Sequence, residues 1–206
     1  MLIRIIGLLF AVVALSYCDS ESSQQREVPW ANGTMFRLEG SNDKLYLPTG
    51  FKASSRYRLQ QDLSIFSPDS ADLRQLQDFL EGLEFNAGQE HVFVDTLTGG
   101  IFFMKEVARI PIHTNSALTL KLMVQQSLEK AVETGQLTNY EKIATKIQQN
   151  NHGGLISLRY ALKVADRAEP NYRSLYIFSN SAKTYQCIGS NATPLDVGPY
   201  LWSLAI

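Results

Sequence analysis

The sequence predicts an α+β fold, a single globular domain in which an antiparallel sheet packs against about three helices. Three observations lead to this prediction. Strand-like and helix-like patterns follow one another in the order strands, helix, hairpin, two helices, strands. The run from Ile156 to Val164 alternates large apolar residues with small or polar ones, which favours an antiparallel strand with one solvent-exposed face. Three other segments carry apolar stripes with helical spacing.

Residues 1–17 are predicted to be a secretory signal peptide. Arg4 precedes an apolar stretch over residues 5–15, and small residues close the segment. A helix over that stretch would be about 17 Å long, too short for a hydrocarbon core of about 30 Å. Residues 18–30 are polar and have no periodic apolar pattern, so they are predicted to form a flexible tether. The single domain is expected to occupy residues 31–206.

Two processing routes remain open at the end of the signal. The segment Leu-Ser-Tyr-Cys over residues 15–18 resembles the lipobox of bacterial lipoproteins, in which the Cys becomes the lipidated first residue; Tyr17 stands where that motif prefers a small residue. In the alternative, cleavage falls before Tyr17, and Cys18 is able to form a disulfide with Cys187. Lipidation of Cys18 is favoured because this residue stands where the apolar core ends.

The first half of the domain is predicted to hold strands, a helix and a hairpin. Residues 34–39 and 44–47 are short strands joined by a turn, and residues 57–65 form a half-buried strand. A helix over 67–83 begins at Ser67 and carries a leucine stripe. Residues 91–95 and 101–104 form a hairpin around a Gly-Gly turn.

The second half is predicted to hold two helices and the best strands. The first helix opens at Ser116 or Thr119 and ends at Gly135. The second begins at Thr138 with a capping box completed by Glu141, and it stops at residues 150–154. After the strand at 156–164 come a hairpin of residues 172–178 and 184–188 and an apolar terminus docked on the core.

Charge favours a protein partner over nucleic acid. The chain has 19 basic and 20 acidic residues, which gives no reason to expect nucleic acid. Residues 105–206 hold 11 basic and 7 acidic side chains, a balance of +4. Arg159, Lys163 and Arg167 recur at strand spacing, so they are predicted to form a binding face for an acidic protein or an anionic membrane surface.

No local motif for catalysis is present. The sequence lacks H-E-x-x-H, C-x-x-C, G-x-S-x-G and the glycine-rich nucleotide signatures. It therefore predicts no catalytic residue, no cofactor and no metal. The alternative is an exported hydrolase whose site is assembled in space from His91, Asp95 or His113. His91 and Asp95 would lie about 13 Å apart along one strand, too far for a direct hydrogen bond.

The favoured hypothesis is an exported cell-envelope protein, anchored to the membrane by an N-terminal lipid at Cys18 and facing the periplasm or the surface. It would be more a binding module for another protein than an enzyme, for example of the immunity or inhibitor type, an example that rests on analogy alone. A secreted soluble protein is the alternative for its location.

Overall fold

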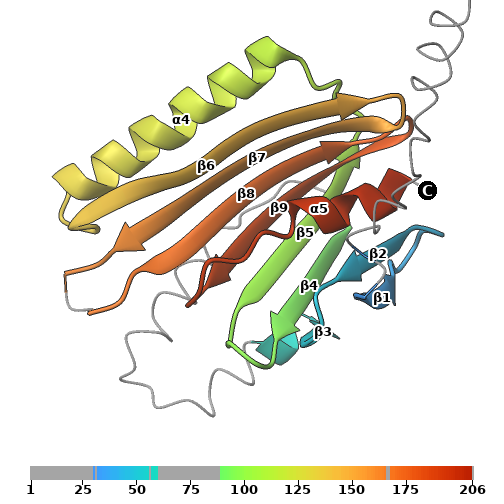
Figure 1. Ribbon diagram of the computed structural model, residues 1–206, viewed down its shortest axis with the longest axis horizontal. Coiled ribbons are helices and arrows are strands. Elements are labelled where there is room, and N and C mark those ends of the chain that lie inside the picture. Colours follow the sequence, from blue (N-terminus) through green and yellow to red (C-terminus); the bar gives the residue numbers. More distant parts are fainter. Residues whose placement is uncertain (1–29, 31, 56, 60–88, 166–167, 206) are drawn as a thin grey trace, which may run out of the picture.

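A long antiparallel sheet dominates the fold. The computed structural model describes residues 30, 32–55, 57–59, 89–165 and 168–205. Seven strands form one sheet in the spatial order β3-β4-β5-β9-β8-β7-β6, and β1 and β2 form a separate two-stranded sheet (Figure 1). The strands are β1 (Thr34–Arg37), β2 (Lys44–Leu47), β3 (Phe51–Ser54), β4 (Glu90–Asp95), β5 (Ile101–Ala108), β6 (Asn139–Asn150), β7 (Gly153–Lys163), β8 (Asn171–Ser179) and β9 (Lys183–Asn191). The helices are α4 (Thr114–Glu133), the short α5 (Gly198–Leu201) and the 3₁₀ helix η1 (Trp202–Ala205).

The predicted α+β class, with about three helices packed on the sheet, is wrong. The fold is β-rich: nine strands make up most of its regular structure, and in the described part of the chain α4 is the one long helix. The second helix predicted in this half, over residues 138–150, is the strand β6. The expected capping box does not form, because the Thr138 backbone N–H donates instead to the Lys163 carbonyl at 2.8 Å.

The error over β6 has a physical cause. Tyr140, Ile143 and Ile147 recur at helical spacing, but a β-bulge between Lys142 and Ala144 inserts one extra residue into the strand. The bulge stretches the two-residue period of the strand into a spacing that looks helical. The β-branched residues of this segment, which include Ile143 and Ile147, favour a strand once β7 offers a pairing partner.

A second correction concerns the strand predicted over 57–65. Tyr57–Leu59 is helical, and Ser55 begins the turn by accepting the Arg58 backbone N–H on its Oγ at 3.1 Å. The strand in this region is β3, which ends at Ser54. The rest of the predicted strand, the predicted helix over 67–83, the signal peptide, Cys18 and Arg167 lie outside the described residues, and so does the tether apart from Trp30.

Several predicted elements are confirmed. The antiparallel pairs β1–β2, β4–β5 and β8–β9 stand where strands or hairpins were expected, and α4 and β7 match their predictions within a few residues. The apolar terminus is docked as expected, since Leu201 and Leu204 are buried.

The seven-stranded sheet is covered on both faces. One face of the sheet carries Phe93, Phe102, Tyr176 and Phe178. We call it the hairpin face, because the β1–β2 hairpin, through Leu45, and the C-terminal helices pack on it in one core cluster. The opposite face is the helix face, where Ile156, Leu158 and Tyr160 pack against Ala117 of α4. Figure 1 shows α4 running along β6 and β7, with the C-terminal segment and β1–β2 at the other side.

The prediction of one solvent-exposed face on β7 is wrong for its first half. Leu158 and Tyr160 are buried on the helix face, as expected. On the hairpin face, however, Ser157 is also buried and Arg159 is half-buried, because the chain after β9 folds back over this part of the sheet. Only Lys163, at the end of β7, is as exposed as predicted.

Candidate functional site: the β6 edge of the sheet

His91 and Asp95, which the sequence predicts on one strand, lie in different surroundings. His91 and Asp95 stand at opposite ends of β4, both on the hairpin face. The Asp95 carboxylate accepts the Leu97 backbone N–H at 2.9 Å and the Thr98 hydroxyl at 2.5 Å, so it closes the turn after β4. Asp95 therefore holds a turn.

His113 lies far from this pair in the fold. It is exposed and immediately precedes α4, which packs on the helix face, whereas His91 is buried on the hairpin face. The fold does not gather His91, Asp95 and His113 into one constellation. Within the described ranges, no group of three or more His, Cys, Asp or Glu side chains is placed to hold a metal ion.

His91 does have charged neighbours on the hairpin face. Its Nε2 atom is buried and makes no hydrogen bond to the described residues. Burial lowers the pKa of His91, although the charges of Glu106 and Glu39 act in the opposite direction. A histidine whose pKa is lowered by folding destabilises the fold as the pH drops below its unfolded value of 6.5. Burial thus favours the neutral form of His91, and within the described residues its Nε2 atom has no hydrogen-bond partner.

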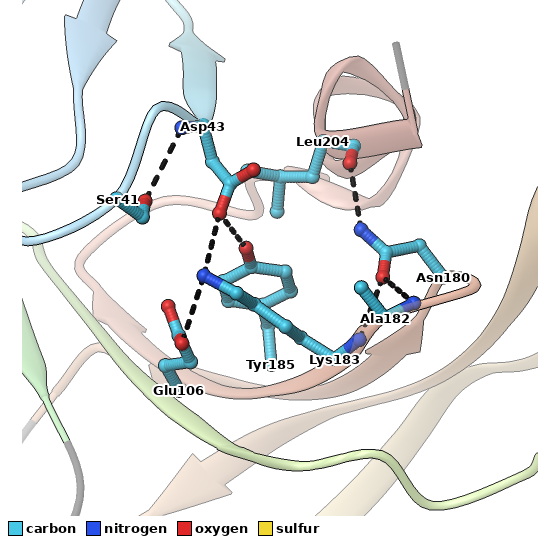
Figure 2. Close-up of polar contacts among 8 residues, drawn as sticks. All are labelled: Ser41, Asp43, Glu106, Asn180, Ala182, Lys183, Tyr185 and Leu204. Atoms are coloured by element: carbon cyan, nitrogen blue, oxygen red, sulfur yellow. Dashed lines mark hydrogen bonds and ion pairs between the residues drawn. The ribbon is translucent and has the colours of Figure 1, made fainter.

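Next to His91, a cluster of ionic contacts ties β1–β2 to the large sheet. Lys183 Nζ lies 3.0 Å from Asp43 Oδ2 and 2.9 Å from Glu106 Oε1, and the Tyr185 hydroxyl donates to Asp43 Oδ2 at 2.6 Å (Figure 2). In the same view Asn180 Nδ2 donates to the Leu204 carbonyl at 2.9 Å, which fixes the C-terminal segment. These contacts join the β1–β2 loop, β5, β9 and the C-terminus, so the cluster is a structural link.

The electrostatics of this link favour its charged form. Burial alone would raise the pKa of Asp43, but hydrogen bonds from Tyr185 and Lys183 outweigh it, and the pKa of Asp43 is lowered. The hydrogen bond to Glu106 raises the pKa of Lys183. Burial, together with the bond to Asp43, raises the pKa of the Tyr185 hydroxyl. The shifts of Asp43, Lys183 and Tyr185 all move the pKa values of these groups away from neutral pH.

A second charged group lies on the hairpin face of β6 and β7. Arg159 Nη2 and Lys146 Nζ both contact Asp196 Oδ2, at 3.3 and 3.5 Å, so two cations share one carboxylate. The Tyr176 hydroxyl donates to Asp196 Oδ1 at 3.4 Å and accepts the Val197 backbone N–H at 3.0 Å. Burial, and then the charge of Asp196, raise the pKa of Tyr176 to about 12.

Of the predicted basic face, Arg159 is therefore partly enclosed and Lys163 is exposed. Beside Arg159 is a shallow hollow with a cavity volume of about 10 Å³, enough for one water-sized group. Its lining residues come from β6, β7, β8 and the loop after β9: Ile143, Arg159, Tyr172, Arg173, Ser174, Pro194 and Leu195. This volume is far below that of a typical small-molecule site.

The most accessible feature at this end is β6 itself. Among the strands that the structure describes, it is the terminal strand of the large sheet and pairs on one side only, with β7. Over its 12 residues no side chain is buried, and only Tyr140 and Ala144 are half-buried. An edge strand of this length presents backbone N–H and C=O groups that another strand can pair with. The other edge, β3, has 4 residues, and its Phe51 is buried.

Exposed apolar side chains are concentrated on α4 and β6. The described residues include nine large apolar side chains that are exposed, and five belong to α4 or β6: Leu118, Leu122, Met123, Ile143 and Ile147. Leu118 and Leu122 are four residues apart, so they share one side of α4. Exposed apolar side chains on an edge strand, here Ile143 and Ile147, indicate an interaction surface.

The sequence pattern named Arg159, Lys163 and Arg167 as a binding face. It did not include Lys142 and Lys146 of the neighbouring strand, because it assigned their segment to a helix. The signal that was available is the composition of 143–147, Ile-Ala-Thr-Lys-Ile, in which three of five residues are β-branched.

Comparisons with known proteins add little to this geometry. No family model matches the sequence, and no curated protein is similar to it. Among solved structures, the chain is similar to the solution structure of cyanobacterial PsbP (CyanoP) from Synechocystis, with a TM-score of 0.43 and 12% sequence identity. That alignment covers 85% of this chain and 88% of the other. A likeness of this extent does not assign the chain to a family or a function.

Proposed function

We propose that this chain is a non-enzymatic protein-binding module that accepts an extended segment of its partner along β6. The observation that carries the proposal is the exposure of β6, a strand of 12 residues that has no buried side chain and that, in the described part of the chain, pairs on one side only. Backbone hydrogen bonds to an added strand supply affinity, and the side chains beside the strand supply specificity.

The charges beside β6 favour an added segment that places an acidic side chain opposite a lysine of this strand. Residues 139–163 hold four basic side chains, Lys142, Lys146, Arg159 and Lys163, against one acidic side chain, Glu141, a balance of +3. Asp196 neutralises part of this charge through Arg159 and Lys146. Lys142 and Lys163 are exposed at the strand surface. Complementary charge of this kind raises the rate of association and sets the register of the partner.

We propose further that the module is exported and anchored by a lipid on Cys18. The support is the resemblance of residues 15–18 to a lipobox and the polar stretch that follows. The burial of Cys187 also favours this route over a disulfide with Cys18, because the Cys187 sulfur lies in the core of the hairpin face and burial raises the pKa of its thiol. Among the described residues, no helix is long and apolar enough to cross a membrane.

The expected native product is a chain that begins at Cys18 and carries added acyl mass. Intact-mass measurement of the protein purified from its own cells tests this directly. The control is the Cys18→Ser variant, which is expected to lose the acyl mass and leave the membrane fraction. A wild-type chain that begins at Tyr17, with Cys18 bridged to Cys187, would show that the soluble secreted form is the correct one.

Charge reversal on β6 is expected to abolish partner binding without unfolding the protein. Full-length bait carrying Lys142→Glu and Lys146→Glu should recover the partner from the cell envelope at least about tenfold less than wild type, since both lysines flank the added strand. Lys52→Glu is the matched control, because Lys52 is an exposed lysine on β3, the other edge strand. Protection of the amides of residues 139–150 from hydrogen exchange in the complex would place the partner on β6. If the partner binds the Lys142→Glu/Lys146→Glu variant and the Lys52→Glu variant equally, and these amides are not protected, the proposal is contradicted.

A further inference from the structure

We infer that the strand which β6 is built to accept is the β6 strand of a second copy of this chain, paired antiparallel across a two-fold axis normal to the sheet. This inference rests on the proposed function and names the partner. It is carried by the way the bulge in β6 arranges complementary side chains on the two faces of the edge.

The register with β7 shows which β6 side chains share a face. Glu141 pairs with Ala161 and Lys146 pairs with Ser157. Ala161 and Ser157 are four residues apart on a regular strand, so they point to the same face, and Glu141 and Lys146 therefore share the hairpin face. Without the extra residue in the bulge, positions 141 and 146 would point to opposite faces.

The helix face has the same arrangement. Tyr140 pairs with Leu162 and Ile147 pairs with Ile156, two partners that both pack in the cluster under α4. Tyr140 and Ile147 therefore share the helix face, although their positions in the sequence also differ by an odd number. In a strand without the bulge they would lie on opposite sides of the sheet.

These placements fit one two-fold register. With the axis between Ile143 and Ala144, Glu141 of one copy lies opposite Lys146 of the other, and the reverse pair forms by symmetry. Tyr140 then lies opposite Ile147 on the other face, again twice. Opposite charges and aromatic–aliphatic pairs directly across two antiparallel strands are both stabilising. The axis keeps the hairpin faces of both copies on one side, so the two seven-stranded sheets become continuous.

The bulge thus has a second consequence beyond its local twist. A bulge and lysines on an edge strand usually discourage pairing with other strands. Here the bulge lies at the two-fold axis, so residues on either side of it share a face although their numbers differ by an odd number. In the register described above, side chains on the same face therefore meet across the axis. In the register that a regular strand would use, side chains from opposite faces would meet. The Lys146 ammonium already contacts Asp196 of its own chain at 3.5 Å, and it also meets Glu141 of the other copy, so it does not impose the repulsion of an isolated edge lysine.

Sedimentation equilibrium of the purified full chain and four variants tests the inference. Wild type is expected to dimerise with a dissociation constant of about 100 µM or below, the range of a modest strand-pairing interface. Glu141→Lys and Lys146→Glu each replace two attractive pairs in the dimer with two repulsive ones, so each should raise that constant about tenfold or more. The double variant Glu141→Lys/Lys146→Glu restores opposite charges in both pairs and should return to within about threefold of wild type. Lys52→Glu, on the opposite edge, should leave the constant unchanged.

Two results would overturn the inference. One is a wild-type chain that stays monomeric up to about 0.5 mM, well above the expected constant. The other is a dimer whose charge-swapped double variant stays as weak as either single variant while thermal unfolding shows all variants folded. Loss of dimerisation alone leaves the proposed function standing if a different protein is captured in a manner that depends on Lys142 and Lys146. If neither a dimer nor β6-dependent capture of another protein is observed, both the inference and the proposed function are contradicted.

Discussion

Replacing Leu158 with alanine is expected to lower the free energy of unfolding by about 2–5 kcal/mol, the usual cost of emptying a packed core site. Leu158 has no exposed surface. It sits in the middle of β7 on the helix face, in the cluster formed with Ala117, Leu120 and Val124 of α4. The paired strands around it hold the backbone in place, so the cavity cannot close by local collapse.

Leu162→Ala is the matched comparison, because Leu162 lies four residues further along the same face but is only half-buried. It should lose less stability than Leu158→Ala, since less apolar surface is removed from the core. Urea unfolding of both variants, followed by circular dichroism, measures the difference. Equal losses at the two positions would show that the helix face is not packed by α4 as described.

Asp43→Asn is expected to cost about 1–3 kcal/mol, because a neutral amide replaces the charged acceptor of two hydrogen bonds. The Asp43 carboxylate accepts both the Tyr185 hydroxyl and Lys183 Nζ. Tyr185 has no exposed surface, so water cannot replace Asp43 as the hydrogen-bond partner of its hydroxyl. Lys183 keeps Glu106, which limits the loss. The two-stranded sheet should loosen first, because Asp43 lies in the loop between β1 and β2.

The stability lost in Asp43→Asn should decrease as the pH is lowered into the acid range. Folding lowers the pKa of Asp43 below its ordinary value of 3.8, so its charge stabilises the fold above that value and this stabilisation disappears as the pH falls through the folded pKa. The stability difference between wild type and Asp43→Asn should therefore be constant near neutral pH and shrink below about pH 3.8. Glu133→Gln, an exposed change at the end of α4, is the control. A difference that grows on acidification would contradict this account.

Local patterns predicted the paired strands well where each strand alternates and a turn joins it to its neighbour. The β4–β5 hairpin is an example: Asp95 and Thr98 close the turn, and Gly99 adopts a positive φ of 70° that few other residues tolerate. The helix α4 could be predicted because its buried side repeats every three or four residues, from Ala117 through Val124 to Leu128.

The candidate site could not be predicted in the same way. The position of β6 at the sheet edge follows from the pairing of β9 with β5, a contact between residues far apart in the chain, because the strands β9-β8-β7-β6 then run outward from β5. The sharing of Asp196 by Arg159 and Lys146 brings three separate segments together. No pattern within a window of ten or twenty residues carries that information, because it is set by long-range pairing.

The sequence by itself determined the strands that alternate, the turns that close them and the apolar side of α4, since each follows from the periodicity of neighbouring residues. The tertiary structure alone decided that residues 139–150 form a strand, because pairing with β7 and the bulge between Lys142 and Ala144 outweigh the helical spacing of Tyr140 and Ile147. It also decided that Arg159 is half-buried, because the chain after β9 returns over the sheet and places Asp196 beside it. Burial and pairing are properties of what a segment packs against, and the residues of the segment do not specify that neighbour.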